Sequence, residues 1–245
     1  MRICCYNLIA MKGYFLIIST LVFILGTGTA FGQRIMVHDP TVQGHESVEP
    51  STATAKVYES RVLPPVRKKI VSEGCPDSLE FAGEVKGSFT RRNSDQTAIF
   101  YQMCQTGNGL GWVGLAVIEN SKVVANFVQD SGWSFGIGKV ADVNRNGLDE
   151  ITLEFGGAMH QGQGGIGVSI IEFKNGKPVE IGWYQAAKLV DSEISTAWIL
   201  TAQPGKTPVY YRQKVVAGKN NKWRRIGPNS VFRMKRLESV FEEVK

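Results

Sequence analysis

Short apolar runs alternate with polar turns from about residue 77 to the end of the chain. Val, Ile, Phe, Tyr and Trp fill the runs, while Gly, Asn and Asp fill the gaps, a pattern typical of β-strands joined by hairpins. The pattern predicts an all-β domain over residues 75–245. Its strands fall into three sets of four: 81–89, 96–104, 111–119 and 122–129; 136–143, 150–157, 165–173 and 177–185; 186–190, 195–203, 208–216 and 222–227.

The three sets share features that indicate a repeat. The last hairpin of each contains Asn followed by Lys, in "ENSKVV", "KNGKPV" and "KNNKWR". Equivalent positions are ~45–55 residues apart, a spacing typical of propellers and other arrays. We therefore expect three four-stranded antiparallel repeats in a partial or atypical β-propeller-like arrangement. Because unpaired strand edges tend to associate, they need cover from the C-terminal segment, residues 33–74 or a partner subunit.

Helical periodicity is confined to the C-terminus. Apolar residues there follow a three-to-four spacing, which predicts a short helix, with a closing strand as the alternative. These residues are Val231, Met234, Leu237, Phe241 and Val244.

The residues before the strands divide into two segments. A basic residue, an apolar run and small residues over 1–32 predict a secretory signal peptide, with an uncleaved anchor as the alternative. The protein is thus expected in the periplasm or outside the cell. Residues 33–74 contain four prolines and a polar run, and their composition favours a flexible linker.

Export changes the meaning of the cysteines. Removal of the signal peptide leaves Cys75 and Cys104, and a single pair in an oxidising compartment favours a disulfide over two unlinked thiols. The formal net charge is +6, and the excess lies near the C-terminus. A basic end suits polyanions or an anionic surface, although we favour a solvated basic face without a partner. The residues that would bind a polyanion are Arg224, Arg225, Arg233 and Arg236.

The stretch "DVNRNGLDEI" (142–151) places oxygen-bearing side chains at alternate positions before a glycine. Ca²⁺ takes six to eight oxygen ligands, and a curled loop can bring such side chains together. Gly147 permits the curl, and the apolar Val143 and Ile151 would anchor the loop to the core. The alternative is a hairpin whose Asn146-Gly147 dipeptide sets a turn without metal.

The longer segment "FGIGKVADVNRNGLDEITLEFGGA" (135–158) resembles one FG-GAP repeat and the related VCBS-type repeats of secreted proteins. The resemblance implies a propeller blade with one Ca²⁺, of modest affinity because only two carboxylates contribute. Two positions depart from the family pattern, since Asn146 and Glu150 stand where aspartates are usual. The implied ligands are Asp142, Asn144, Asn146, Leu148 through its carbonyl, and Glu150.

The other repeats lack this set of carboxylates. Alignment with the first repeat places Ser88 at Asp142 and Thr97 at Glu150. In the third repeat the loop is shorter. One cation per chain is therefore expected.

Further polar residues allow two other interpretations of the function. "GWSFG" matches the nucleophile elbow of serine hydrolases, with Ser134 as nucleophile and His160 downstream, but glycines rather than a helix follow it. The loop "AMHQGQGG" offers His160, Gln161 and Gln163 to a ligand. We favour an exported, non-enzymatic calcium-binding module that binds an extracellular protein or polysaccharide, without specific nucleic acid and with scope for homo-oligomers. The alternatives are a secreted serine hydrolase and a polyanion-binding protein.

Overall fold

Strands account for 62% of the residues that the computed structural model describes. The structure describes residues 33–42, 49–72, 79–105, 111–156, 163–191, 193–218, 222–237 and 240–244. All the helices and strands below lie within the unit Arg34–Lys245. The predicted signal peptide lies outside the described residues. Within those ranges, no helix combines the length and apolarity that a membrane crossing needs.

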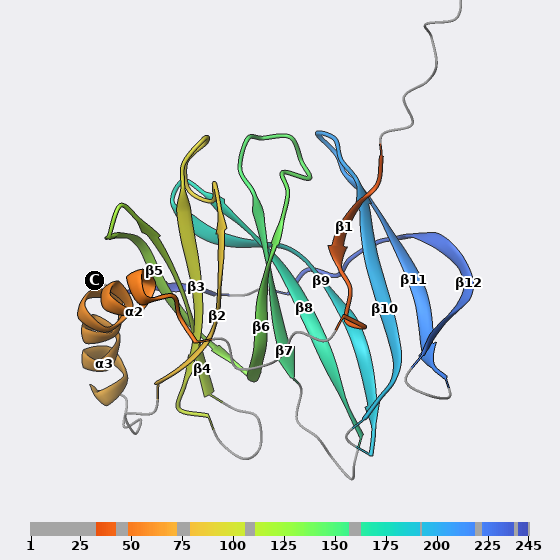
Figure 1. The fold of residues 1–245 in the computed structure, drawn as a ribbon, viewed down its shortest axis with the longest axis horizontal. Coiled ribbons are helices and arrows are strands. Elements are labelled where there is room, and N and C mark those ends of the chain that lie inside the picture. Colours follow the sequence, from red (N-terminus) through yellow and green to blue (C-terminus); the bar gives the residue numbers. More distant parts are fainter. Residues whose placement is uncertain are drawn as a thin grey trace, which may run out of the picture. The chain divides into compact units, whose positions relative to one another are not determined.

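Five strands form the first sheet, in the order β13-β5-β4-β3-β2, with every pair antiparallel (Figure 1). Four of them correspond to the first predicted set, and a two-residue hairpin joins β4 to β5. Their bounds are β2 Leu79–Gly87, β3 Gln96–Met103, β4 Gly111–Glu119, β5 Lys122–Ser131 and β13 Glu242–Glu243.

Eight strands form the second sheet, in the order β12-β11-β10-β9-β8-β7-β6, and β1 pairs with β10 beside this path. The second and third predicted sets therefore share one continuous sheet. The runs 177–185 and 186–190 are a single strand, in which the register shifts at Ala186, because Ala187 pairs with Ile166 and Gln185 with Gly167. The bounds are β1 Ile35–His38, β6 Trp133–Val140, β7 Glu150–Gly156, β8 Gln163–Lys174, β9 Lys177–Val190, β10 Glu193–Gln203, β11 Val209–Ala217 and β12 Trp223–Phe232.

Residues 52–72 are helical, so the linker interpretation is wrong over this range. The helical elements are α2 (Thr52–Val57), the π-helical turn η1 (Tyr58–Val62) and α3 (Leu63–Ser72). Ser51 caps α2 by accepting a hydrogen bond from the Thr54 N–H. Apolar residues four apart place one buried stripe against the first sheet. The linker prediction considered composition only and therefore missed this spacing. The stripe consists of Tyr58, Val62, Val66 and Ile70.

The described C-terminal residues are extended, so the predicted helix is wrong and the closing-strand alternative holds. Met234, Phe241 and Val244 each contact a different apolar cluster, which an extended chain can reach and one helical face cannot. β13 covers the edge of β5, and β1 pairs with β10. The C-terminal segment and the residues before 75 thus both add strands to the sheets.

The two sheets share one apolar cluster. Phe89 from the β2–β3 loop and Phe100 from β3 meet Ile151 and Phe173 from the second sheet, and all four are almost fully buried. Burial of this kind stabilises a fold by roughly 25 cal/mol per Å² of apolar surface removed from water. The cluster fixes two loops side by side, because Phe89 and Ile151 lie at the ends of those loops.

Candidate functional site: the loop between β6 and β7

The loop that joins β6 to β7 folds around the carboxylate of Asp142. One oxygen of Asp142 accepts a hydrogen bond from the Asn146 N–H (2.8 Å), and the other accepts one from the Gly147 N–H (2.7 Å). Arg145 and Gly147 have φ angles of 59° and 88°, and glycine adopts this left-handed conformation without strain. Asp142 therefore holds the curl that the sequence predicts.

The two asparagines close the loop in the same way. The side-chain oxygen of Asn144 accepts from the Asn146 N–H (3.1 Å), and that of Asn146 accepts from the Leu148 N–H (2.8 Å). Val143 and Ile151 are fully buried, as anchors of the loop should be. The loop thus forms one turn of backbone around Asp142, Asn144, Asn146 and Leu148. The side-chain oxygens of the first three accept hydrogen bonds from the N–H groups of this turn.

Glu150 is fully buried at the start of β7. Its Oε2 accepts a hydrogen bond from the Val143 N–H at 2.9 Å, whereas its Oε1 has no hydrogen-bond partner. Burial, assisted by the nearby carboxylates of Asp142 and Glu172, raises the pKa of the Glu150 carboxyl to about 7. Ionised Glu150 is therefore costly in this position. The carboxyl is stable there either when it is protonated or when a nearby cation compensates its charge.

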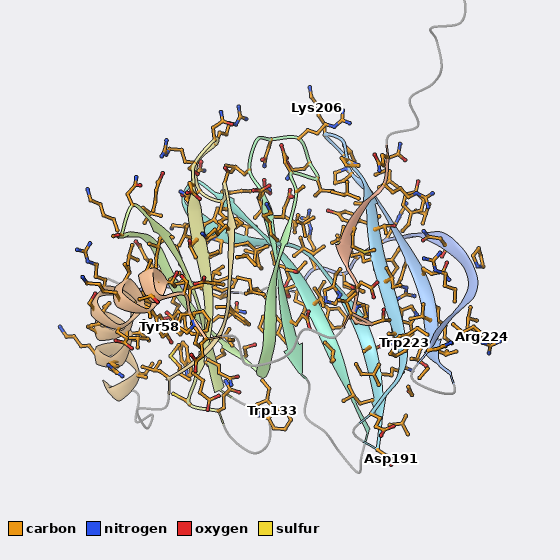
Figure 2. All side chains as sticks on the ribbon, in the orientation of Figure 1. Tyr58, Trp133, Asp191, Lys206, Trp223 and Arg224 are labelled. Carbon is orange, nitrogen blue, oxygen red and sulfur yellow. The ribbon has the colours of Figure 1, made fainter. Side chains whose placement is uncertain are left out.

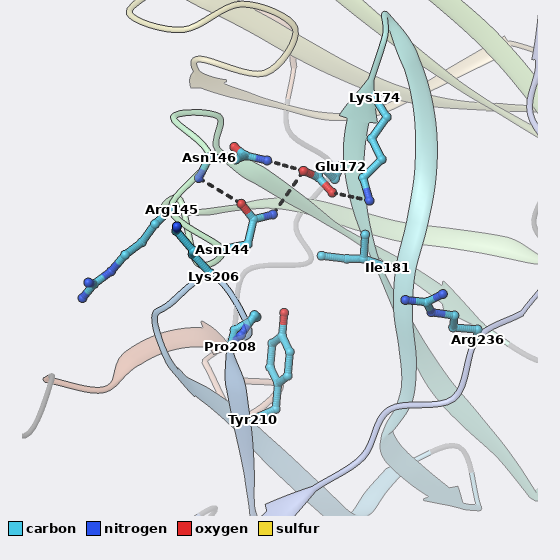
Figure 3. A pocket seen from close by; sticks show the side chains of 10 residues that line it. All are labelled: Asn144, Arg145, Asn146, Glu172, Lys174, Ile181, Lys206, Pro208, Tyr210 and Arg236. Carbon is cyan, nitrogen blue, oxygen red and sulfur yellow. Dashed lines mark hydrogen bonds and ion pairs between the residues drawn. The ribbon is translucent and has the colours of Figure 1, made fainter.

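Glu172 on β8 completes the cluster, and sequence reasoning missed it. Its Oε1 accepts from the amide of Asn144 (3.1 Å) and from the amide of Asn146, and its Oε2 lies 3.1 Å from Lys174 Nζ (Figure 3). Glu172 is only 4% exposed. A signal was present, because Glu172 lies within the apolar run "GIGVSIIEF" (165–173), where a charge is unusual.

The loop between β2 and β3 has the same architecture. Gln96 opens β3 as Glu150 opens β7, and its Oε1 accepts from the Phe89 N–H (2.9 Å), seven residues earlier, as Glu150 accepts from Val143. The counterpart of Glu150 is therefore Gln96, and the alignment of Thr97 with Glu150 is wrong by one residue.

The partners across the sheet also correspond. Gln96 pairs with Glu119, while Glu150 and Glu172 adjoin the Ile151–Ile171 pair and so lie across from each other. The Gln96 amide donates to Glu119 (3.3 Å). In the second loop the carboxylate of Glu150 faces the carboxylate of Glu172. This pair therefore lacks the hydrogen-bond donor that Gln96 supplies in the first loop.

A pocket of about 540 Å³ opens beside the loop. It lies between the β6–β7 loop, the ends of β8 and β9, the β10–β11 loop and the C-terminal segment (Figure 3). Four of its residues are cationic and one, Glu172, is anionic. The lining comprises Asn144, Arg145, Asn146, Glu172, Lys174, Ile181, Lys206, Pro208, Tyr210 and Arg236.

A second hollow of about 460 Å³ lies on the other side of the same loop. It shares Asn146, Glu172 and Lys174 with the first and adds Arg91 and Arg92. Among the described residues, no three His, Cys, Asp or Glu side chains are arranged as a complete metal ligand set. A cation at this loop would therefore need amide or carbonyl oxygens in addition to carboxylates.

The other predicted site residues are dispersed. Ser134 lies within β6, not at the strand-to-helix turn that a nucleophile elbow requires. His160 and Gln161 lie outside the described residues, and Gln163 begins β8. Cys75 also lies outside them, so its disulfide with Cys104 stays a prediction.

The basic C-terminal residues do not form one site. Arg224 and Arg225 are exposed on β12, and Arg233 follows that strand, whereas Arg236 lines the pocket. Figure 2 shows Lys206 at the top of the view, and Arg224 at the right, away from that end. Only Arg236 of the predicted polyanion residues joins the cations around the loop.

No family model, no curated protein and no solved structure matches this chain. The resemblance to FG-GAP and VCBS-type repeats thus depends on the loop residues alone.

Proposed function

We propose that the protein is an exported, non-enzymatic β-module that binds one Ca²⁺ at the loop 142–150 and Glu172. The ion would fix the shape of a surface that recognises an extracellular protein or a polysaccharide. The apolar run within residues 1–32 supports export. The carboxylates and amides around the loop support a hard, oxygen-seeking cation over a softer metal.

The difference between the two equivalent loops carries this proposal. In the first loop the Gln96 amide donates to Thr90 (2.7 Å) and to Glu119 (3.3 Å), so the polar atoms of the side chain are bonded. In the second loop Glu150 replaces the amide, and its Oε1 is buried without a hydrogen bond. A divalent cation between Glu150 and Glu172 would compensate both charges.

The expected ligands include one residue that the sequence pattern did not supply. Glu150, Glu172 and Asp142 would provide the negative charge, and Asn144, Asn146 and the Leu148 carbonyl the neutral oxygens. The expected affinity lies in the ~10⁻⁴–10⁻³ M range of extracellular calcium modules. Lys174 competes with the cation, because it already pairs with Glu172.

The same comparison supports an internal repeat. The loops after β2 and β6 share their buried apolar residue and the hydrogen bond that spans seven residues. We therefore also propose that the strand sets are repeats related to the FG-GAP and VCBS type. A propeller-like arrangement would require separate blades, whereas β6 to β12 form one sheet.

Calcium titration of thermal unfolding tests the proposal. For a dissociation constant near 10⁻⁴ M, millimolar Ca²⁺ stabilises the protein by about 1.5–2.5 kcal/mol, so the melting temperature rises measurably. We expect Glu150→Gln and Glu172→Gln to lose this rise. Glu180→Gln is the matched control, because Glu180 is also buried but bonds Ser169 on the neighbouring strand.

The change on calcium addition, not the starting stability, is the deciding quantity. A wild-type protein without any rise at millimolar Ca²⁺ would refute the proposal. An equal rise in Glu150→Gln would place the ion elsewhere. Lys174→Gln should bind Ca²⁺ more tightly than wild type, since a competing charge is removed.

A further inference from the structure

We propose that the pocket beside the loop binds an anionic saccharide of one or two rings, with a carboxylate or sulfate group held by Lys206 and Arg236. This deepens the binding role proposed above by naming the partner class. It depends on the pocket's own cations and does not require that calcium be bound.

The charge of the pocket favours an anion. Arg145, Lys174, Lys206 and Arg236 oppose a single carboxylate, Glu172, which is paired with Lys174. Over the part of the chain that the structure describes, no ion pair involves Arg145, Lys206 or Arg236. Like charges gathered in a hollow repel one another, and a bound anion relieves that repulsion.

The backbone beneath two of these cations is held in place. The Gly205 N–H donates to the Val143 carbonyl (2.9 Å), which joins the Lys206 loop to the β6–β7 loop. On either side of Arg236, Lys235 exchanges two backbone hydrogen bonds with Trp183, and the Leu237 N–H donates to Glu180 (2.7 Å).

Lys206 and Arg236 therefore project from backbone that is already fixed. Binding then has to order only their side chains, which lowers its entropic cost.

The remaining walls suit a sugar ring. Pro208 and Tyr210 lie side by side in the pocket and Ile181 lies apart from them, so apolar surface is available for the flat face of a ring (Figure 3). Burial raises the pKa of the Tyr210 hydroxyl above its usual range, so the hydroxyl stays protonated and able to donate. A pocket of about 540 Å³ is in the range of small-ligand sites, and far larger than an inorganic anion needs.

Calorimetry with a matched pair of ligands tests this inference, in the presence of EDTA so that calcium has no part. The acid is digalacturonate, and its control is the dimethyl ester, which has the same rings without charge. A sulfated disaccharide distinguishes sulfate from carboxylate. We expect the ester to bind at least about tenfold more weakly than a charged disaccharide.

Two double variants with equal changes in net charge locate the site. Lys206→Gln with Arg236→Gln should weaken binding about tenfold or more, because charge-assisted hydrogen bonds are lost. Arg224→Gln with Arg225→Gln should leave the affinity within about twofold, since these residues lie outside the pocket. Equal losses in both pairs would show diffuse attraction and overturn the assignment.

Three further outcomes would also overturn it. They are equal binding of acid and ester, no binding of either charged disaccharide at millimolar concentration, and inorganic phosphate competing as well as the saccharide. Because EDTA is present throughout, none of them depends on the calcium proposal.

Discussion

The imidazole Nδ1 of His38 lies 2.6 Å from the hydroxyl oxygen of Tyr184, although 146 residues separate the two in the chain. The other ring nitrogen lies 2.7 Å from Glu154 Oε1. With Nδ1 accepting from the Tyr184 hydroxyl and Nε2 donating to Glu154, both contacts are hydrogen bonds. The bonds join β1 to β9 and β7, so they fix the N-terminal strand on the second sheet.

Tyr184→Phe should therefore destabilise the fold by about 1–3 kcal/mol, because a buried ring nitrogen loses its partner. Chemical denaturation measures the change, and hydrogen exchange should show faster opening of β1. Tyr211→Phe is the control, since its hydroxyl makes only a 3.4 Å contact with Gln203. A similar loss in both variants would contradict the role of this bond.

Glu150 predicts a pH dependence of stability in the absence of calcium. Its carboxyl has a pKa of about 7 in the folded protein, raised mainly by burial, whereas an unfolded glutamate titrates near ~4.3. Between these values the folded state binds more protons than the unfolded state. The free energy of unfolding therefore falls as pH rises through this window.

Glu150→Gln removes this dependence. The amide can accept from Val143 and donate toward Glu172, as Gln96 does toward Glu119. Above pH 7 we expect the variant to exceed wild type by up to about 3 kcal/mol, with the two converging near pH 4. Denaturant unfolding in EDTA at several pH values gives the difference. A constant gap at all pH values would contradict titration of Glu150.

Packing of α3 on the first sheet predicts a contrast between two neighbouring helix positions. Val66 is fully buried against the sheet, whereas Lys68 is exposed. Val66→Ala should cost about 1–3 kcal/mol through lost contacts and a cavity, and Lys68→Ala less than about 0.5 kcal/mol. Thermal unfolding measures both, and equal small effects would mean that the helix does not pack there in solution.

Gly114 predicts a steric effect in β4. A Cβ at this position would lie 1.9 Å from Cζ of Tyr101, whose fully buried ring is held by a hydrogen bond to Asn126 (2.8 Å). Gly114→Ala should therefore cost about 3 kcal/mol or more.

Gly176 supplies the comparison for this substitution. It has a φ of 77° in an open turn, with nothing near its Cβ position. Gly176→Ala should cost only about 1–2 kcal/mol of backbone strain. Denaturant unfolding ranks the two, and a larger loss for Gly176→Ala would reverse the argument.

Local patterning was sufficient for most of the strands, because alternation and turn residues act between near neighbours in the chain. It also located the curl at Asp142 and Gly147, whose bonds span only five residues. Composition misled over residues 52–72, where four-residue spacing creates a buried stripe despite the prolines. The apolar spacing after Val231 failed for the opposite reason, since its members contact separate clusters.

Tertiary structure alone decided which charges meet. Glu172 comes from a neighbouring strand, and Lys206 and Arg236 come from segments far along the chain, so no local pattern could place them beside Asn144. The pairing of β7 with β8 brings Glu150 across from Glu172, and burial by both sheets then raises the pKa of Glu150. Strand formation depends on neighbours in sequence, whereas the electrostatics of the site depends on distances that only the folded sheets set.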